Sequence, residues 1–218
     1  MSCPVLYVLA VVNGAGKSSV LGQVLRLDAM TWFDPDDFAA EWAARSGCTL
    51  AEAQGVAWDE SLRRLDDAIA HGRDHAFETT LGGHTLAGRL AAAARSSHDV
   101  LMMYCGLSTP EQHFARVQLR VASGGHAVPD AAVRARWHRA CNNLVALLPD
   151  LAEVRVYDNS QDAAPDTPRP APKQLAHWRG GRLMFPQPAH DAAALLTTPE
   201  WAKPVLEAML RLDPTDVT

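Results

Sequence analysis

The sequence has few cysteines and no excess of basic residues, and both shortages narrow the class of protein. Its four cysteines are scattered through 218 residues, without the paired spacing of a metal site or the density of a disulfide framework. The 20 Lys and Arg are outnumbered by 25 Asp and Glu, giving a formal net charge of -5. The nine histidines show no metal-ligand spacing such as H-E-x-x-H. We therefore expect a reduced, cytoplasmic protein that binds neither nucleic acid nor membrane.

Long hydrophobic runs are also missing. The only apolar N-terminal stretch, Val5 to Val12, is too short to span a bilayer, and no basic region precedes it. Its continuous apolar and β-branched residues instead predict a parallel strand that is buried on both faces. Because 48% of the residues are hydrophobic, the chain can build one sizeable core.

Strand and helix patterns alternate as far as residue 160. Further strands are predicted at Met30–Phe33, His75–Glu78, Val100–Leu107 and Glu153–Tyr157. Helices are predicted at Ser18–Leu27, Trp58–His71, Thr85–Arg95, from about Thr109, and at Asp130–Leu148. This alternation predicts an α/β fold with a mainly parallel sheet covered by helices on both faces.

The last part of the chain has a different composition. Six of the fourteen prolines lie between Pro165 and Pro188, which predicts an irregular excursion or linker before a final helix at about Pro199 to Leu212. We therefore divide the chain into a core at residues 1–160 and a proline-rich segment at residues 161–218, packed on the core or peripheral to it.

A phosphate-binding loop is predicted directly after the first strand, at Asn13-Gly14-Ala15-Gly16-Lys17-Ser18-Ser19. The glycines allow backbone amides to face a phosphate, Lys17 would reach the β- and γ-phosphates, and Ser18 would ligate Mg²⁺. ATP and Mg²⁺ are therefore the expected cofactors. Val11 stands where the G-x-x-x-x-G-K-[ST] pattern has its first glycine, so a nucleotide-binding module without catalysis stays open as an alternative.

Acidic residues follow the second predicted strand, in Asp34-Pro35-Asp36-Asp37, at the rim where open parallel sheets bind ligands. A carboxylate there can accept the proton of an attacking hydroxyl. We assign this role to Asp36, with Asp34 as the second candidate near the substrate. The alternative is that these aspartates cap a helix beginning near Phe38, and capping by Asp37 with catalysis by Asp36 is also open.

The segment Phe77-Glu78-Thr79-Thr80-Leu81-Gly82-Gly83 should reach the same rim after the third strand. Glu78 would hold the Mg²⁺ shell or a substrate hydroxyl, and Thr79 and Thr80 would offer further hydrogen-bonding groups to the substrate. A purely structural turn is the alternative, because threonine and glycine also favour turns for conformational reasons.

Arginines are concentrated between Glu111 and Arg139. Five arginines there accompany only two acidic residues, a local charge of +3 in a chain of net charge -5. Arg116 and Arg120 lie four residues apart, which predicts a lid at about residues 111–139 whose arginines stabilise the transferred phosphoryl group. Arg134 and His126 are further candidates for contacting phosphate or substrate. The alternative is a solvated helix face and an incidental loop histidine.

Together, five motifs resemble the zeta-toxin family of small-molecule kinases and its stand-alone bacterial relatives. They are N-G-A-G-K-S-S, D-P-D-D-F, F-E-T-T-L-G-G, A-R-V-Q-L-R-V-A-S-G-G-H-A-V-P and V-Y-D-N-S. The resemblance covers about Val5 to Ser160. It implies a P-loop NTPase fold of the nucleotide-kinase type, with a five-stranded parallel sheet, ATP and Mg²⁺.

The resemblance also implies roles for single residues. The family's phosphate lysine, metal hydroxyl, general base and phosphate-clamping arginine fall on Lys17, Ser18, Asp36, and Arg116 or Arg120. His126 stands where the toxins have a second arginine. The family's substrate-binding glutamate has no clear counterpart near Glu60 to Asp66.

The implied activity is ATP-dependent transfer of the γ-phosphate to a hydroxyl of a small molecule. In toxin members that acceptor is UDP-N-acetylglucosamine, which is the leading candidate here, and an antitoxin protein is the partner that the family suggests. Two alternatives stay open. One is a kinase of the same fold acting on an antibiotic, a nucleoside or another sugar, and the other is a catalytically silent ATP-binding regulatory module.

Overall fold

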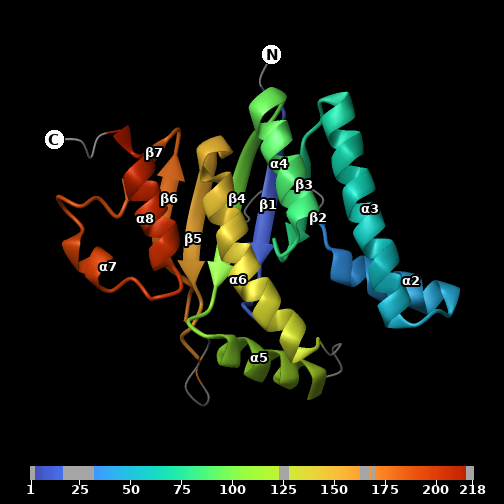
Figure 1. Cartoon of the computed structure of the whole chain (residues 1–218). Coiled ribbons are helices and arrows are strands. Elements are labelled where there is room, and N and C mark those ends of the chain that lie inside the picture. Colours follow the sequence, from blue (N-terminus) through green and yellow to red (C-terminus); the bar gives the residue numbers. More distant parts are fainter. Residues whose placement is uncertain (1–2, 17–31, 123–127, 163–166, 168–169, 215–218) are drawn as a thin grey trace.

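The computed structural model describes residues 3–16, 32–122, 128–162, 167 and 170–214. At its centre is a seven-stranded sheet with the strand order β2-β3-β1-β4-β5-β6-β7 (Figure 1). The strands are β1 (Val5–Val11), β2 (Trp32–Phe33), β3 (His75–Thr79), β4 (Asp99–Gly106), β5 (Glu153–Asp158), β6 (Lys173–Arg179) and β7 (Arg182–Phe185). The helices are α2 (Pro35–Ser46), α3 (Leu50–His71), α4 (His84–Ser96), α5 (Pro110–Ala122), α6 (Asp130–Leu147), α7 (Ala192–Leu196) and α8 (Lys203–Leu212).

The first five strands are parallel, which confirms the predicted α/β fold and its five-stranded parallel core. Strand β1 lies between β3 and β4, and its residues from Val8 onward are buried, as its continuous apolar sequence requires. Because all five strands run the same way, their carboxyl ends meet at one edge of the sheet, where a ligand site is expected.

The proline-rich segment differs from the prediction of an irregular excursion. Strands β6 and β7 add to the sheet in antiparallel orientation next to β5. They are joined at Gly180-Gly181, where φ values of 57° and 77° suit a tight hairpin turn that only glycine adopts easily. The prolines flank these strands and leave their interior free, so the composition gave a misleading indication of a linker. The division at residue 160 itself stays a prediction.

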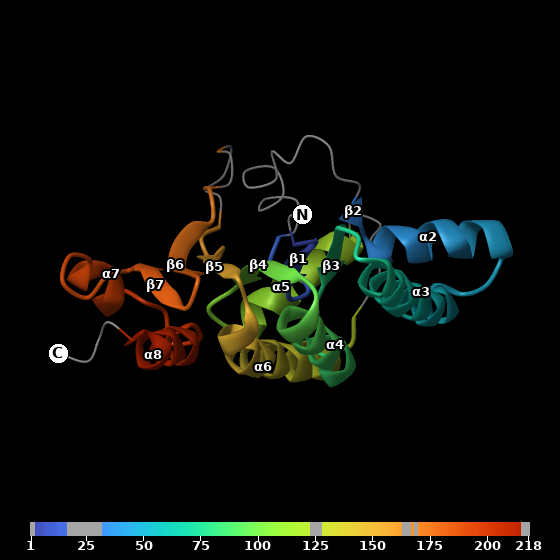
Figure 2. The ribbon, with the colours of Figure 1, turned by 90° about the horizontal axis from the view of Figure 1, so that it is seen from above.

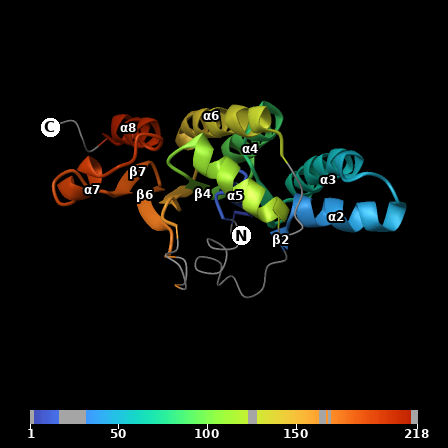
Figure 3. The same ribbon diagram turned by 90° about the horizontal axis from the view of Figure 1, so that it is seen from below.

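Helices α4, α6 and α8 lie side by side on one face of the sheet, as Figure 2 shows from above. Helices α2 and α3 pack against each other beyond β2, at one edge of the sheet. Helix α5 crosses below the carboxyl ends of the strands, and Figure 3 shows it spanning that end of the molecule. Among the described helices, none is both long and apolar enough to cross a membrane.

The main core lies between the sheet and α4, α6 and α8, and includes Phe77, Met102, Tyr104 and Trp178. The C-terminal part joins it through Trp201, whose ring packs against Tyr104 and donates a hydrogen bond to Asp158 at 3.1 Å. A Cβ on Gly106 would come within 2.8 Å of the Trp201 ring. Glycine at this position therefore makes the notch that the indole fills.

Candidate active site

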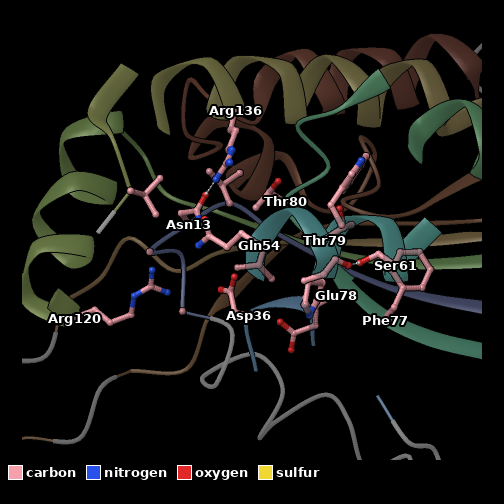
Figure 4. A pocket seen from close by; sticks show the side chains of 18 of the residues that line it. Asn13, Asp36, Gln54, Ser61, Phe77, Glu78, Thr79, Thr80, Arg120 and Arg136 are labelled. Carbon is pink, nitrogen blue, oxygen red and sulfur yellow. Dashed lines mark hydrogen bonds between the residues drawn. The ribbon is translucent and has the colours of Figure 1, made fainter. Parts of the chain in front are cut away.

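A cavity of about 550 Å³ opens at the carboxyl ends of β1 and β3 (Figure 4). Its walls come from the loop after β1, the first turn of α2, one face of α3, the end of β3, and helices α5 and α6. This is the rim at which sequence reasoning placed the phosphate loop and the carboxylates.

The described half of the phosphate loop has the conformation expected of an anion cradle. Gly14 and Gly16 have φ values of 84° and 87°, in the left-handed region, and the amide of Ala15 donates to the carbonyl of Val12 at 2.9 Å. Asn13, Gly14 and Gly16 line the cavity, whereas Ala15 is buried behind it. Four residues with predicted roles, Lys17, Ser18, Ser19 and His126, lie outside the described residues.

Buried side chains hold the outer carbonyls of this loop. His113 donates from Nδ1 to the carbonyl of Asn13 at 2.6 Å, and Asn159 donates from Nδ2 to the carbonyl of Ala15 at 2.8 Å. A Cβ on Gly14 would meet the backbone carbonyl of His113 at 2.8 Å, so helix α5 lies directly against the loop. These bonds fix two carbonyls of the loop from outside the cavity, an arrangement that suits a loop whose remaining amides would bind phosphate.

His113 is fully buried, and its pKa is lowered to about 4, chiefly because burial disfavours the charged imidazolium. The neighbouring Arg116 lowers this pKa further, while the hydrogen bond to Asn13 opposes the shift. At neutral pH the ring is therefore uncharged and carries its proton on Nδ1. The sequence does not single out His113, because an isolated histidine in a helix has no distinguishing local pattern.

Val11 is the last residue of β1, in register with Cys105 on β4, and is 3% exposed. It packs with Leu9, Leu107 and Tyr157 in a small cluster below the loop. The valine is thus accommodated as a strand residue. Its effect on catalysis stays a prediction.

The two candidate aspartates have different positions. Asp34 is the N-cap of α2, and its side chain accepts a hydrogen bond from the amide of Asp36 at 2.8 Å. Asp36 lines the cavity, whereas Asp34 is not among the lining residues. The helix begins at Pro35 rather than near Phe38, so capping belongs to Asp34 and not to Asp37. The placement of Asp36 agrees with the role predicted for it.

Glu78, Thr79 and Thr80 all line the cavity, and Glu78 is 4% exposed. The turn that follows is fixed from two sides. Thr79 Oγ1 accepts from the amide of Leu81 at 3.0 Å, and Asn143 on α6 donates to the carbonyl of Leu81 at 2.7 Å. The segment therefore has a structural role in the turn, and the binding role predicted for its side chains stays a prediction.

Arg116 and Arg120 both line the cavity from α5. Arg116 is held in place by an ion pair, which does not suit a mobile lid. Its side chain is 8% exposed, and Nη2 lies 2.6 Å from an oxygen of Asp162, in the loop after β5. Arg120 lies one turn further along the helix and points toward the loop side of the cavity in Figure 4.

Arg134 is not among the cavity-lining residues. It pairs with Glu111 at 2.8 Å and lies over the ring of Phe114. Its helical neighbour Arg136 lines the cavity instead and donates from Nη1 to the side chain of Asn13 at 2.9 Å. Helix α6 therefore does contribute an arginine to the cavity, but it is Arg136 and not the predicted Arg134. The rotation of the helix about its axis decides which of the two side chains faces the loop.

One face of α3 supplies residues that sequence reasoning missed. Gln54, Ala57, Trp58 and Ser61 line the cavity and follow the spacing of a single helix face. Glu60 lies off that face and is bonded to Arg63 and Arg64. The i, i+4, i+7 spacing of Gln54, Trp58 and Ser61 could have indicated this face.

The charges in the cavity are segregated. The arginines come from α5 and α6, beside the phosphate loop, whereas Asp36 and Glu78 come from α2 and β3, next to α3. Figure 4 shows Arg120 and Arg136 on one side, and Glu78 and Ser61 on the other. A phosphate donor would be favoured beside the arginines, which leaves the α3 side for a second substrate.

Comparison with known proteins supports the fold. No protein-family model matches the chain. An uncharacterized protein of Haemophilus influenzae is 27% identical over 125 residues, covering 57% of this chain and 86% of that protein.

Three solved structures match more widely, at low identity. A chain of the AvrRxo1-ORF1:AvrRxo1-ORF2 complex with ATP matches with a TM-score of 0.61 and 13% identity, covering 97% of this chain and 77% of its own. A chain of the PezAT chromosomal toxin–antitoxin system of Streptococcus pneumoniae matches with a TM-score of 0.55 and 15% identity, covering 100% and 86%. A putative kinase of Chloroflexus aurantiacus has a TM-score of 0.50 and 13% identity, covering 62% and 78%. The resemblance to zeta-toxin-like P-loop kinases is therefore confirmed at the level of the fold.

Proposed function

We propose that this protein is an ATP-dependent phosphotransferase that moves the γ-phosphate of ATP to a hydroxyl of a small molecule. The observation that carries the proposal is the single cavity that brings together a phosphate loop, arginines and a carboxylate at the carboxyl ends of the parallel strands. Fold alone does not establish an activity, so the argument rests on these side chains.

Each group has a role in the proposed reaction. The acceptor oxygen attacks the γ-phosphorus, the bond from that phosphorus to the bridging oxygen breaks, and ADP leaves. Asp36 takes the proton of the hydroxyl, while Lys17 and the arginines stabilise the negative charge on the transferred group. Arg136 adds a positioning role, because it holds the Asn13 side chain at the start of the loop.

The oxygen-rich lining suits Mg²⁺, which prefers carboxylate, hydroxyl, water and phosphate oxygens. Among the residues described, no group of three or more His, Cys, Asp or Glu side chains is placed to hold a metal by itself. The metal would therefore enter with the nucleotide and be held by Ser18, with Glu78 in its outer shell, where it would neutralise phosphate charge.

The test is phosphate transfer from radiolabelled ATP with Mg²⁺ across sugar nucleotides, nucleosides, free sugars and hydroxyl-bearing antibiotics. We expect one acceptor class to be labelled, and Lys17→Ala or Asp36→Asn to reduce the rate at least about 100-fold. Asp37→Asn is the matched control, because Asp37 is exposed and outside the cavity lining. ATP binding without transfer to any acceptor would instead support a catalytically silent nucleotide-binding module.

The acceptor and the partner are also proposals. UDP-N-acetylglucosamine is the first acceptor to test, with an antibiotic, a nucleoside or another sugar as alternatives. An antitoxin is the proposed protein partner. One of the similar structures comes from a toxin–antitoxin system, and another is a complex of two proteins. Coexpression with the product of a neighbouring reading frame, followed by copurification, tests this part.

A further inference from the structure

We propose that Trp58 and Gln54 form a subsite that binds a flat, hydrogen-bonding heterocycle of the acceptor, by stacking on the indole and by contacts of the amide with the ring edge. This inference rests on the proposed phosphotransferase function. It specifies the chemical class of the part of the acceptor that does not receive the phosphate. The chemistry fits a ring joined to a hydroxylated sugar, either as a free nucleoside or as part of a sugar nucleotide.

The first argument is the exposure of Trp58. The residue is 41% exposed although it lines a cavity, and large aromatic residues are normally covered by the protein itself. The preceding and following turns of this face carry Gln54 and Ser61, so the indole stands between two polar groups. An exposed aromatic ring with polar neighbours is the arrangement that binds flat ligands by stacking.

The second argument is that the neighbouring backbone is shaped to the indole. A Cβ on Gly83 would lie 3.6 Å from Cη2 of Trp58, so the ring edge rests directly on the turn after β3. That turn is fixed by the bond from Asn143 to Leu81. Contact with a fixed turn restricts the indole, and a restricted platform binds a ring at a lower entropic cost than a mobile one.

The third argument is the chemistry of Gln54. Its amide offers one acceptor and two donors, one helical turn from Trp58 on the same face of α3. An amide side chain can bond in plane with the donor and acceptor pattern of a heterocycle, as Asn and Gln do with base edges. Gln54 and Asp36 line the same cavity, so a ring held at Gln54 would place its attached hydroxyls in the cavity that holds the proposed base.

The same cavity also contains apolar surface outside α3. Leu119 on α5 is 68% exposed and lines the cavity, as do Val128 and Pro129 at the start of α6. The donor phosphates are expected beside Arg116 and Arg120, so the two substrates would occupy different parts of one cavity.

The experiment measures acceptor and ATP kinetics for the full chain with Trp58→Ala, Trp58→Phe and Gln54→Ala. The probes are uridine, UDP-N-acetylglucosamine and free N-acetylglucosamine, which separate a nucleoside from a sugar nucleotide and from a sugar without the ring. We expect Trp58→Ala to raise the KM for the ring-bearing acceptor about 10- to 100-fold, with the KM for ATP unchanged. Trp58→Phe should restore most of the loss, and Gln54→Ala should raise the same KM about 3- to 10-fold.

Asp59→Ala is the control on the same helix, because Asp59 is exposed and outside the cavity lining. A second readout is the tryptophan fluorescence of the wild type and of Trp58→Ala during titration with the same three probes. Only ring-bearing probes should quench the wild type, and the quenching should disappear in the variant.

Three results would overturn the inference while leaving the phosphotransferase proposal intact: an unchanged acceptor KM in Trp58→Ala, equal use of free N-acetylglucosamine, or an effect confined to the KM for ATP. If ATP binds without turnover and no ring-bearing probe quenches Trp58, the inference is also wrong. Failure of the wild type to bind ATP at all would instead overturn the proposed function.

Discussion

Two adjacent glycines in the turn after β3 allow a matched test of how this turn positions Arg136. A Cβ on Gly82 would lie 2.9 Å from Cγ, 3.2 Å from Cβ and 3.4 Å from Cα of Arg136. These atoms are the stem of the arginine and its backbone, so rotation of the guanidinium cannot relieve the clash. A Cβ on Gly83 would meet only Cη2 of Trp58, at an ordinary 3.6 Å.

The expected cost of Gly82→Ala follows from opposing terms. The φ of Gly82 is outside the left-handed region, so alanine can adopt this backbone conformation. Alanine should then stabilise the fold by about 0.4–1 kcal/mol, because it lowers the conformational entropy of the unfolded chain. The clash of the new methyl group with Arg136 should lower the free energy of unfolding by about 1–3 kcal/mol. Disturbing the Arg136 bond to Asn13 adds about 1 kcal/mol at this partly buried site. We therefore expect a net loss of about 1–3 kcal/mol in the free energy of unfolding.

Gly83→Ala should change that free energy by less than about 0.5 kcal/mol. Gly83 is the extended N-cap of α4, where alanine caps less well than glycine, and this cost offsets the entropic gain. Urea unfolding and ATP titration calorimetry of both variants are the measurements. The reasoning is refuted if the two variants have the same stability, or if Gly82→Ala weakens ATP binding no more than Gly83→Ala does.

Three further predictions concern the walls of the cavity. Because the unfolded pKa near 6.5 exceeds the folded value of about 4, His113 should destabilise the fold by up to about 3 kcal/mol as pH falls through that interval; overlapping stability profiles for wild type and His113→Asn would contradict this. Asn159→Ala removes the donor to the Ala15 carbonyl and should weaken ATP binding about tenfold in calorimetry; unchanged affinity would show that this bond does not shape the loop. Arg136→Ala should reduce kcat/KM at least about tenfold and Arg134→Ala less than about threefold; equal losses would oppose the assignment of Arg136.

The elements that could be predicted are those with strong local signals. Strand β1 and the glycine-rich loop adjoin in sequence, so one short segment carries the apolar run, the glycines and the turn. The positions of Asp36 and Glu78 could also be predicted, because residues near the carboxyl ends of neighbouring parallel strands meet at one edge of the sheet.

The features that escaped prediction depend on contacts between distant segments. The choice of Arg136 over Arg134 is made by the rotation of α6 against Gly82, which is 54 positions away along the sequence. His113 and Asn159 acquire their roles only because α5 and the residue after β5 lie against the loop that follows β1. The hairpin of β6 and β7 does carry a local signal, the glycine pair, but the prolines on either side of it favour an irregular segment.

The notch at Gly106 has a consequence for dissecting the protein by truncation. If the chain were cut near residue 160, Trp201 would leave an open slot beside Tyr104, and strand β5 would lose β6, which pairs with the backbone along one of its edges. An unpaired edge of that kind recruits strands from other molecules. The smallest soluble fragment should therefore extend through α8, and shorter fragments should aggregate even though they contain every residue assigned to the chemistry.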